Sequence, residues 1–137
     1  MERPKVLVAD GSVFMRTMLK IQLESLNFDV IATAKDNKEA SVKCLELKPD
    51  VVVVDIAIAD VDDFALIRAA QKSTPLSGFI VMIPDQPGLL EVVVEAVRAG
   101  AWGYIEKPVS PEGMKLRLRD ALRRQKHDRT EEKISCW

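Results

Sequence analysis

The chain has 137 residues, of which 47% are hydrophobic and 30% charged, and its formal net charge is −1 at pH 7. These values are typical of one globular domain with a single core. A net charge near zero argues against general electrostatic binding to nucleic acid or to a membrane surface. The N-terminus has no apolar signal-peptide segment, and no stretch approaches the ~18 apolar residues of a membrane span. We therefore expect a soluble, cytoplasmic protein.

Short apolar runs alternate along the chain with longer segments of helical period. The pattern predicts five strands, at residues 6–9, 28–32, 51–54, 79–83 and 102–105. It predicts five helices that alternate with them, at residues 12–26, 37–47, 62–72, 88–99 and 111–126. Five strands alternating with five helices indicate an α/β fold, a doubly wound five-stranded parallel sheet with helices on both faces.

Residues 1–126 form the predicted domain, and residues 127–137 are predicted to be a C-terminal tail or linker because they have mixed charge and no apolar stripe. The two cysteines have neither metal-ligand spacing nor a disulfide framework. We expect Cys44 to pack in the core and Cys136 to be an exposed thiol. The only histidine, His127, lies in the tail, and no Gly-x-Gly occurs. Dinucleotide and P-loop motifs, a histidine triad and a histidine metal site are therefore not indicated.

Polar residues follow three of the predicted strands. Asp10 follows the first, Asp55 follows the four valines of the third, and Lys107-Pro108 follows the fifth. The carboxyl ends of parallel strands converge on one crevice, so two carboxylates and an ammonium can meet there around a phosphoryl group and a metal ion. This constellation predicts a phospho-acceptor pocket.

The chain resembles the receiver domain of two-component response regulators over about residues 5–125. The resemblance is carried by the opening segment at 6–16, by the strand Val-Val-Val-Val-Asp that ends at Asp55, and by the segment at 99–108 that contains Lys107-Pro108. It implies the flavodoxin-like receiver fold, with Asp55 taking a phosphoryl group from a sensor histidine kinase or phosphotransfer protein. It also implies that Lys107 contacts that group.

In the family, Mg²⁺ is held by acidic residues, and the lysine precedes a proline through a cis bond. Here the resemblance implies that Asp10, Asp55 and the main-chain carbonyl of Ala57 hold Mg²⁺. A second acidic residue usually follows Asp10, but this chain has Gly11, so we expect weak metal binding. Ala59 and Asp63 replace a common proline and glycine after the acceptor, and the loop there is expected to differ.

The family also has a switch hydroxyl at the end of the fourth strand. The candidates here are Ile83, Pro84 and Asp85, none of which is Ser or Thr. Asp85 would place negative charge near the phosphoryl group unless its side chain turns outward or helps to hold the cation. Tyr104 corresponds to the family's rotating aromatic residue, and ordinary packing is an alternative role for it.

Each site residue has a structural alternative. Asp55 could be a capping carboxylate. A charge directly after four valines is costly to half-bury, however, and this cost favours a functional role. Asp10 could form an Asx turn with Ser12. Lys107 could be a solvated lysine at a strand end.

The predicted helix at 88–99 is apolar except for one stripe formed by Glu91, Glu95 and Arg98. With the fifth strand and the last helix it predicts a surface for a downstream protein partner or a homodimer, the alternative being burial by its own neighbours. The basic residues of the last helix are expected to be solvated or salt-bridged, not bound to nucleic acid.

Two functions stay open: a phosphorylatable switch that depends on Asp55, and a pseudo-receiver that binds proteins without phosphorylation. The implied chemistry is at most self-phosphorylation, not turnover catalysis. A phosphatase of the dehalogenase type is disfavoured because Asp55-Ile56-Ala57 lacks its second aspartate.

Overall fold

Four consecutive valines, residues 51–54, form the centre of a parallel sheet and are completely buried. A run of β-branched residues suits a strand that is covered on both faces. The computed structural model describes residues 3–135, with side chains described as far as residue 123. Its five strands have the order β2-β1-β3-β4-β5. They are β1 Lys5–Ala9, β2 Asp29–Ala34, β3 Val51–Asp55, β4 Gly78–Ile83 and β5 Gly103–Glu106.

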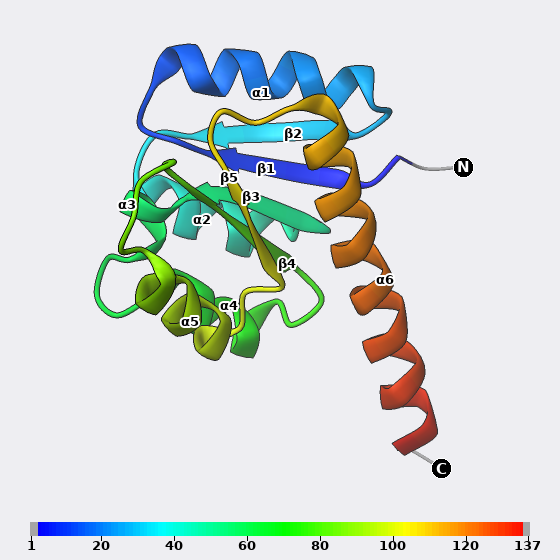
Figure 1. The fold of residues 1–137 in the computed structure, drawn as a ribbon. Coiled ribbons are helices and arrows are strands. Elements are labelled where there is room, and N and C mark those ends of the chain that lie inside the picture. The colour runs from blue at the N-terminus through cyan, green and yellow to red at the C-terminus, as the bar shows by residue number, and fades with distance from the viewer. Residues whose placement is uncertain (1–2, 136–137) are drawn as a thin grey trace.

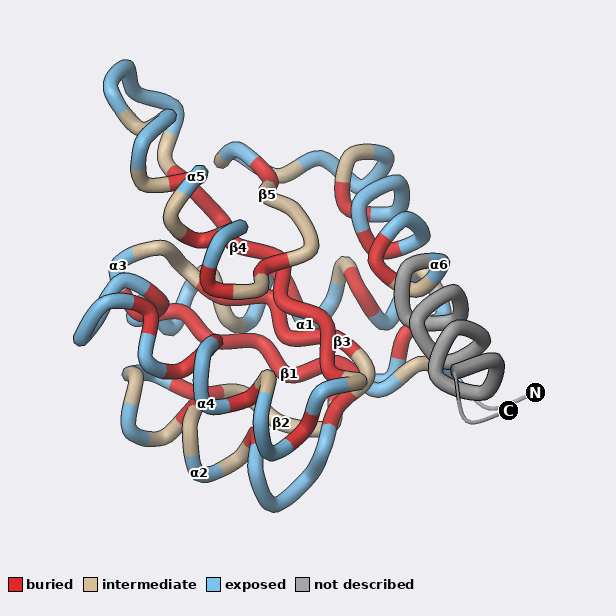
Figure 2. Tube along the Cα trace, turned by 90° about the horizontal axis from the view of Figure 1, so that it is seen from below, coloured by how far each residue is buried: buried red, intermediate tan, exposed pale blue. Residues whose placement is uncertain are grey.

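Helices cover both faces of the sheet (Figure 1). They are α1 Val13–Ser25, α2 Asn37–Leu47, α3 Ile56–Ala59, α4 Ala65–Ser73, α5 Leu90–Ala99 and α6 Pro111–Ser135. Side chains of β3 alternate between two cores: Val51 and Val53 pack with α1 and α6, and Val52 and Val54 with α2 to α5. Buried residues follow the strands and the inner helix faces (Figure 2). The predicted α/β fold is confirmed.

Two helices differ from the sequence prediction. The helix expected at 62–72 begins at Ala65, and the one-turn helix α3 precedes it. The last helix continues to Ser135 instead of ending near Lys126, because no Gly or Pro interrupts a stretch rich in good helix formers. The residues predicted to be a tail or linker are thus helical as far as Ser135. Cys136 lies outside the described residues, whereas Cys44 is buried as expected.

The loop before α4 has three consecutive residues with left-handed backbone, Asp62, Asp63 and Phe64, with φ of 51°, 55° and 59°. This conformation is unfavourable for residues other than glycine, and Asp tolerates it best. Arg68 Nε donates to the Asp63 carbonyl at 2.9 Å, and Phe64 is buried in the core. These contacts stabilise the loop, and α4 therefore begins at Ala65, after the three left-handed residues.

Among the described helices, none has both the length and the apolar character that crossing a membrane requires.

Candidate phospho-acceptor site

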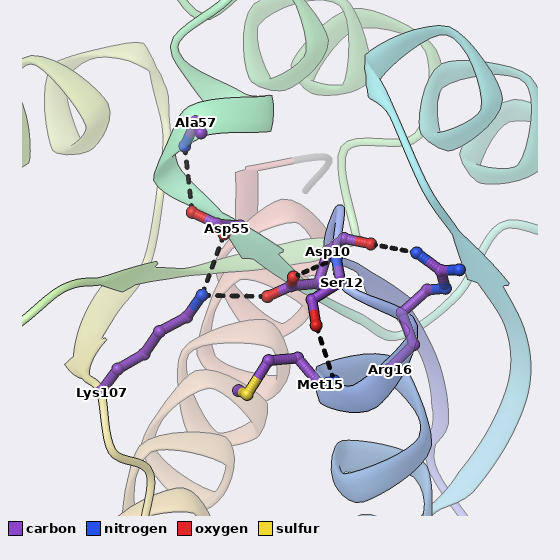
Figure 3. A network of polar contacts seen from close by, with 7 residues as sticks. All are labelled: Asp10, Ser12, Met15, Arg16, Asp55, Ala57 and Lys107. Carbon is purple, nitrogen blue, oxygen red and sulfur yellow. Dashed lines mark hydrogen bonds and ion pairs between the residues drawn. The ribbon is translucent and has the colours of Figure 1, made fainter.

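Asp10, Asp55 and Lys107 meet at the carboxyl ends of β1, β3 and β5 (Figure 3). Lys107 Nζ lies 3.0 Å from Asp10 Oδ2 and 2.9 Å from Asp55 Oδ2. One ammonium thus bridges two carboxylates that are far apart in sequence. The three side chains meet where the topology of a parallel sheet predicts, at the carboxyl ends of its strands.

Asp10 is the most buried member of the site, with an exposed fraction of 2%. Its Oδ1 accepts from the Ser12 N–H at 2.9 Å, and its main-chain carbonyl accepts from Arg16 Nη1 at 2.7 Å. Ser12 Oγ in turn accepts from the Met15 N–H and caps α1. One oxygen of Asp10 therefore makes the expected Asx turn with Ser12, and the other faces Lys107.

Asp55 also has two roles in the structure. Its Oδ1 accepts from the Ala57 N–H at 3.1 Å and caps the one-turn helix α3, while Oδ2 faces Lys107. The Asp55 side chain is 18% exposed. It is the more accessible of the two carboxylates, since the Asp10 side chain is only 2% exposed.

Lys107 is held by both its main chain and its side chain. Its N–H donates to the Ile83 carbonyl at 2.8 Å, and its bond to Pro108 is cis. Burial alone would lower the pKa of Lys107, but the hydrogen bonds and charges of Asp55 and Asp10 outweigh it, so the pKa is raised above the ordinary value of a lysine. Lys107 therefore stays charged at neutral pH.

The donor set for a divalent cation is small. Asp10 and Asp55 supply carboxylate oxygens, Gly11 supplies no side-chain oxygen, and the exposed Ala57 has only its main chain. In the described part of the chain, no group of three or more His, Cys, Asp or Glu side chains could hold a metal. Mg²⁺ often keeps several waters and uses one or two carboxylates. The residues present therefore fit a largely hydrated Mg²⁺ that competes with Lys107 for the same oxygens.

The positions of the missing switch hydroxyl contain no substitute. Asp85 is exposed and makes no hydrogen bond or ion pair with a described residue, and Pro84 accepts only from the Gln86 N–H. Tyr104 is half-buried against the core, and the Arg117 guanidinium lies 5.4 Å from its ring centre. Tyr104 thus has packing and cation–π contacts, and no hydroxyl partner is present in Ile83, Pro84 or Asp85.

Helix α5 divides into two faces. Its buried face consists of Val93, Ala96 and Ala99, and its exposed apolar residues are Leu90, Val94 and Val97. Arg98 and Glu95 form an exposed ion pair at 2.9 Å. The core of the domain therefore covers only one face of α5, and apolar side chains on its other face remain exposed.

An apolar stripe on α1 was missed by the sequence reasoning. Val13, Phe14, Met18 and Ile21 are exposed, and Phe14 is 69% accessible. The i, i+4, i+7 spacing of Phe14, Met18 and Ile21 was visible in the sequence, but it is also the spacing of a core face. Leu19 and Leu23 make that core contact instead. The stripe begins at the first turn of α1, beside Asp10.

Comparison with known proteins defines the class. The sequence profile of the response regulator receiver domain matches residues 6–119. Chemotaxis protein CheY of Thermotoga maritima is 36% identical over 107 residues, which cover 78% of this chain and 88% of that protein. A protein-glutamate methylesterase/protein-glutamine glutaminase of Methanococcoides burtonii is 38% identical over 105 residues, but these span only 30% of its length.

Solved structures agree. The signal receiver domain of a modulated diguanylate cyclase from Desulfovibrio desulfuricans superposes with a TM-score of 0.78 at 27% identity, covering 92% of this chain and 98% of that one. A CheY-like receiver domain protein from Methanospirillum hungatei gives 0.79 at 24% identity with the same coverage, a likeness of fold. The chain belongs to the response regulator receiver family, and it acts in two-component signal transduction.

Proposed function

We propose that this receiver domain accepts a phosphoryl group on Asp55 from a sensor histidine kinase or a phosphotransfer protein in the cytoplasm. The observation that carries the proposal is the bridge from Lys107 Nζ to Asp10 and Asp55, with Asp55 the accessible carboxylate. An Asp55 oxygen attacks phosphorus, the P–N bond of the phosphohistidine breaks, and the imidazole leaves with that electron pair. The product is an acyl phosphate.

Phosphoryl transfer needs mainly alignment and charge neutralisation. Asp55 Oδ1 is oriented by the Ala57 N–H, and Asp10 is fixed by Ser12 and Arg16. The Lys107 side chain is 23% exposed, so it has room to move. Its ammonium can therefore move from the Asp55 carboxylate to the oxygens of the incoming phosphoryl group. Bound Mg²⁺ would supply further neutralisation, with Asp10, Asp55 and the Ala57 carbonyl as its protein ligands.

The proposed partners use two surfaces. The apolar stripe of α1, formed by Val13, Phe14, Met18 and Ile21, begins beside the pocket and suits the phosphodonor, which must bring its histidine to Asp55. The exposed residues of α5, Leu90, Val94 and Val97, together with β5 and α6, suit a downstream partner or a second copy. Helices α1 and α5, which carry these residues, lie over opposite faces of the sheet (Figure 1).

A second candidate is a pseudo-receiver that binds partners without phosphorylation. Three features favour it: Gly11 at a ligand position, no switch hydroxyl at residues 83–85, and two carboxylates that already share the Lys107 ammonium. In this case the ion pairs are structural and hold the ends of β1, β3 and β5 together.

Incubation with acetyl phosphate and Mg²⁺, followed by intact-mass measurement, separates the two functions. A phosphorylatable domain gains one phosphoryl group, and Asp55→Asn gains none. No gain in wild type, with protein binding retained, would establish the pseudo-receiver. Thermal melts of wild type and Asp55→Asn are the control that both proteins are folded.

A further inference from the structure

A groove of about 390 Å³ lies at the amino ends of the strands, away from the phospho-acceptor site. It is lined by Pro4 before β1, by the turn between α1 and β2, and by one side of α6, namely Pro4, Leu26, Asn27, Phe28, Lys115, Arg119, Leu122 and Arg123. Asp10 and Asp55 lie at the other ends of β1 and β3. A ligand in the groove would therefore not touch the acceptor.

The rim of this groove is cationic. Lys115, Arg119 and Arg123 follow one another at intervals of four residues, so they lie along one side of α6. All three are exposed, and none makes an ion pair or hydrogen bond with a residue whose side chain is described. Asp120 is on the same helix but does not line the groove. The three cations of the rim therefore have no direct ion-pair partner among the described side chains.

The floor of the groove is apolar. Leu26 and Leu122 are half-buried against the core cluster that contains Phe28. A ligand that fills the groove would cover apolar surface and also meet three cations. It must therefore have both apolar and anionic groups.

The spacing of the cations identifies the class of ligand. From Lys115 to Arg123 the helix rises ~12 Å, too far for a single phosphate ion to contact all three side chains. Carboxylates placed along a peptide can match this length. A single-stranded nucleic acid also can, but it gains affinity by stacking bases on exposed aromatic rings. Among the described residues that line the groove, Phe28 is the only aromatic one, and it is buried.

We propose that this groove, at the opposite end from Asp55, docks an acidic peptide segment of a partner protein, with carboxylates on Lys115, Arg119 and Arg123 and apolar side chains on the floor. Binding there is independent of phosphorylation chemistry. It would tether a partner while leaving the acceptor open to its phosphodonor.

The test uses the full chain and a fluorescein-labelled peptide of alternating Glu and Leu, with anisotropy as the readout. We expect saturable binding that weakens as salt rises, and a loss of roughly tenfold or more in affinity for Arg119→Glu, equivalent to ~1.4 kcal/mol or more. Lys38→Glu is the matched control, because Lys38 is an exposed residue of α2 with no described ion pair, and the charge change is the same. It is expected to bind like wild type.

Further arms distinguish the alternatives. Polyglutamate is expected to bind more weakly than the alternating peptide because it leaves the floor uncovered. Equal affinities of Arg119→Glu and Lys38→Glu would overturn the proposal, as would polyglutamate binding as tightly as the alternating peptide. A single-stranded oligonucleotide that binds more tightly than the peptide would assign the groove to nucleic acid instead. Melting curves of both variants confirm folding, and Arg119 is exposed, so its replacement is tolerated.

Discussion

Gly78 lies directly beneath the indole ring of Trp102. A Cβ atom at residue 78 would overlap the ring carbons, so only glycine leaves room for the ring. The main-chain N–H of Trp102 also donates to the main-chain carbonyl of Phe79 at 2.8 Å. Trp102 therefore fixes the start of β5 against β4. The same strand, β5, ends directly before Lys107.

Gly78→Ala is expected to destabilise the fold, because the ring must move or β5 must shift. The expected loss is ~1–3 kcal/mol, the usual cost of overpacking a core. Urea denaturation followed by tryptophan fluorescence measures it. Gly103→Ala is the matched control in the neighbouring strand, where a Cβ would meet only Ile80 Cδ1 at 3.7 Å. A similar loss in both variants would mean that strand glycine itself, not the Trp102 contact, sets the cost.

Gly11→Asp is expected to strengthen Mg²⁺ binding. A Cβ at residue 11 would meet only the Lys35 carbonyl at 3.8 Å, an ordinary van der Waals contact, so the backbone there has room for a side chain. One more charge at ligand distance is worth ~1–4 kcal/mol near a protein surface, so affinity should rise about tenfold or more. Calorimetric titration measures the affinity, and Gly11→Asn controls for side-chain bulk. Equal affinities of wild type and Gly11→Asp would refute the role assigned to this position.

If Asp55 is phosphorylated, the acyl phosphate is expected to form slowly and to persist. Because Mg²⁺ binds weakly, less of the transition-state charge is neutralised, both when the acyl phosphate forms and when it is hydrolysed. Ala57 has no hydrogen-bonding group to hold a hydrolytic water in line, so Ala57→Glu or Ala57→Asn should shorten the lifetime. Ala57→Leu controls for size at this exposed position. Intact-mass time courses measure the decay; loss within seconds in wild type, or labelling of Asp55→Asn, would contradict this view of the pocket.

Lys107→Met is expected to destabilise the domain at neutral pH by ~2 kcal/mol, because it leaves the buried Asp10 facing Asp55 without a cation. The folded-state pKa of Lys107 is raised above the ordinary value of a lysine, so its contribution is complete below that ordinary value and is lost as the pH rises through the folded value. The stability difference between wild type and Lys107→Met should therefore be constant through neutral pH and shrink only at alkaline pH, above the ordinary pKa of lysine. Urea denaturation across this range is the measurement. If the stability difference between the two proteins instead grew as the pH rose, the predicted direction of the pH dependence would be wrong.

Val93 and Val94 are neighbours on α5 with opposite environments, at 8% and 39% exposure. Val93→Glu buries a charge and should lower stability by roughly 3 kcal/mol or more. Val94→Glu should leave the melting temperature nearly unchanged and disrupt self-association or partner docking. Light scattering and thermal melts on the same samples decide this. An unchanged mass in both variants, with stability falling in both, would make α5 an ordinary core helix.

Much of the fold followed from the sequence. The valines at 51–54 and the alternation of apolar runs with helical segments predicted the parallel sheet, because a strand covered on both faces must be apolar throughout. The meeting of Asp10, Asp55 and Lys107 was predictable for the same reason, since parallel strands end at one edge. Those inferences needed only local pattern and the topology it implies.

The tertiary structure decided which parts of each pattern are covered. Periodicity shows that a helix has an apolar side, but burial depends on surfaces supplied by residues far away in sequence. Phe14 on α1 and Val94 on α5 therefore stay exposed while Leu19 and Val93 enter the cores. The bridge formed by Lys107 has the same origin: a sequence places charges at strand ends, whereas the distances that pair one ammonium with two carboxylates exist only once three strands lie side by side.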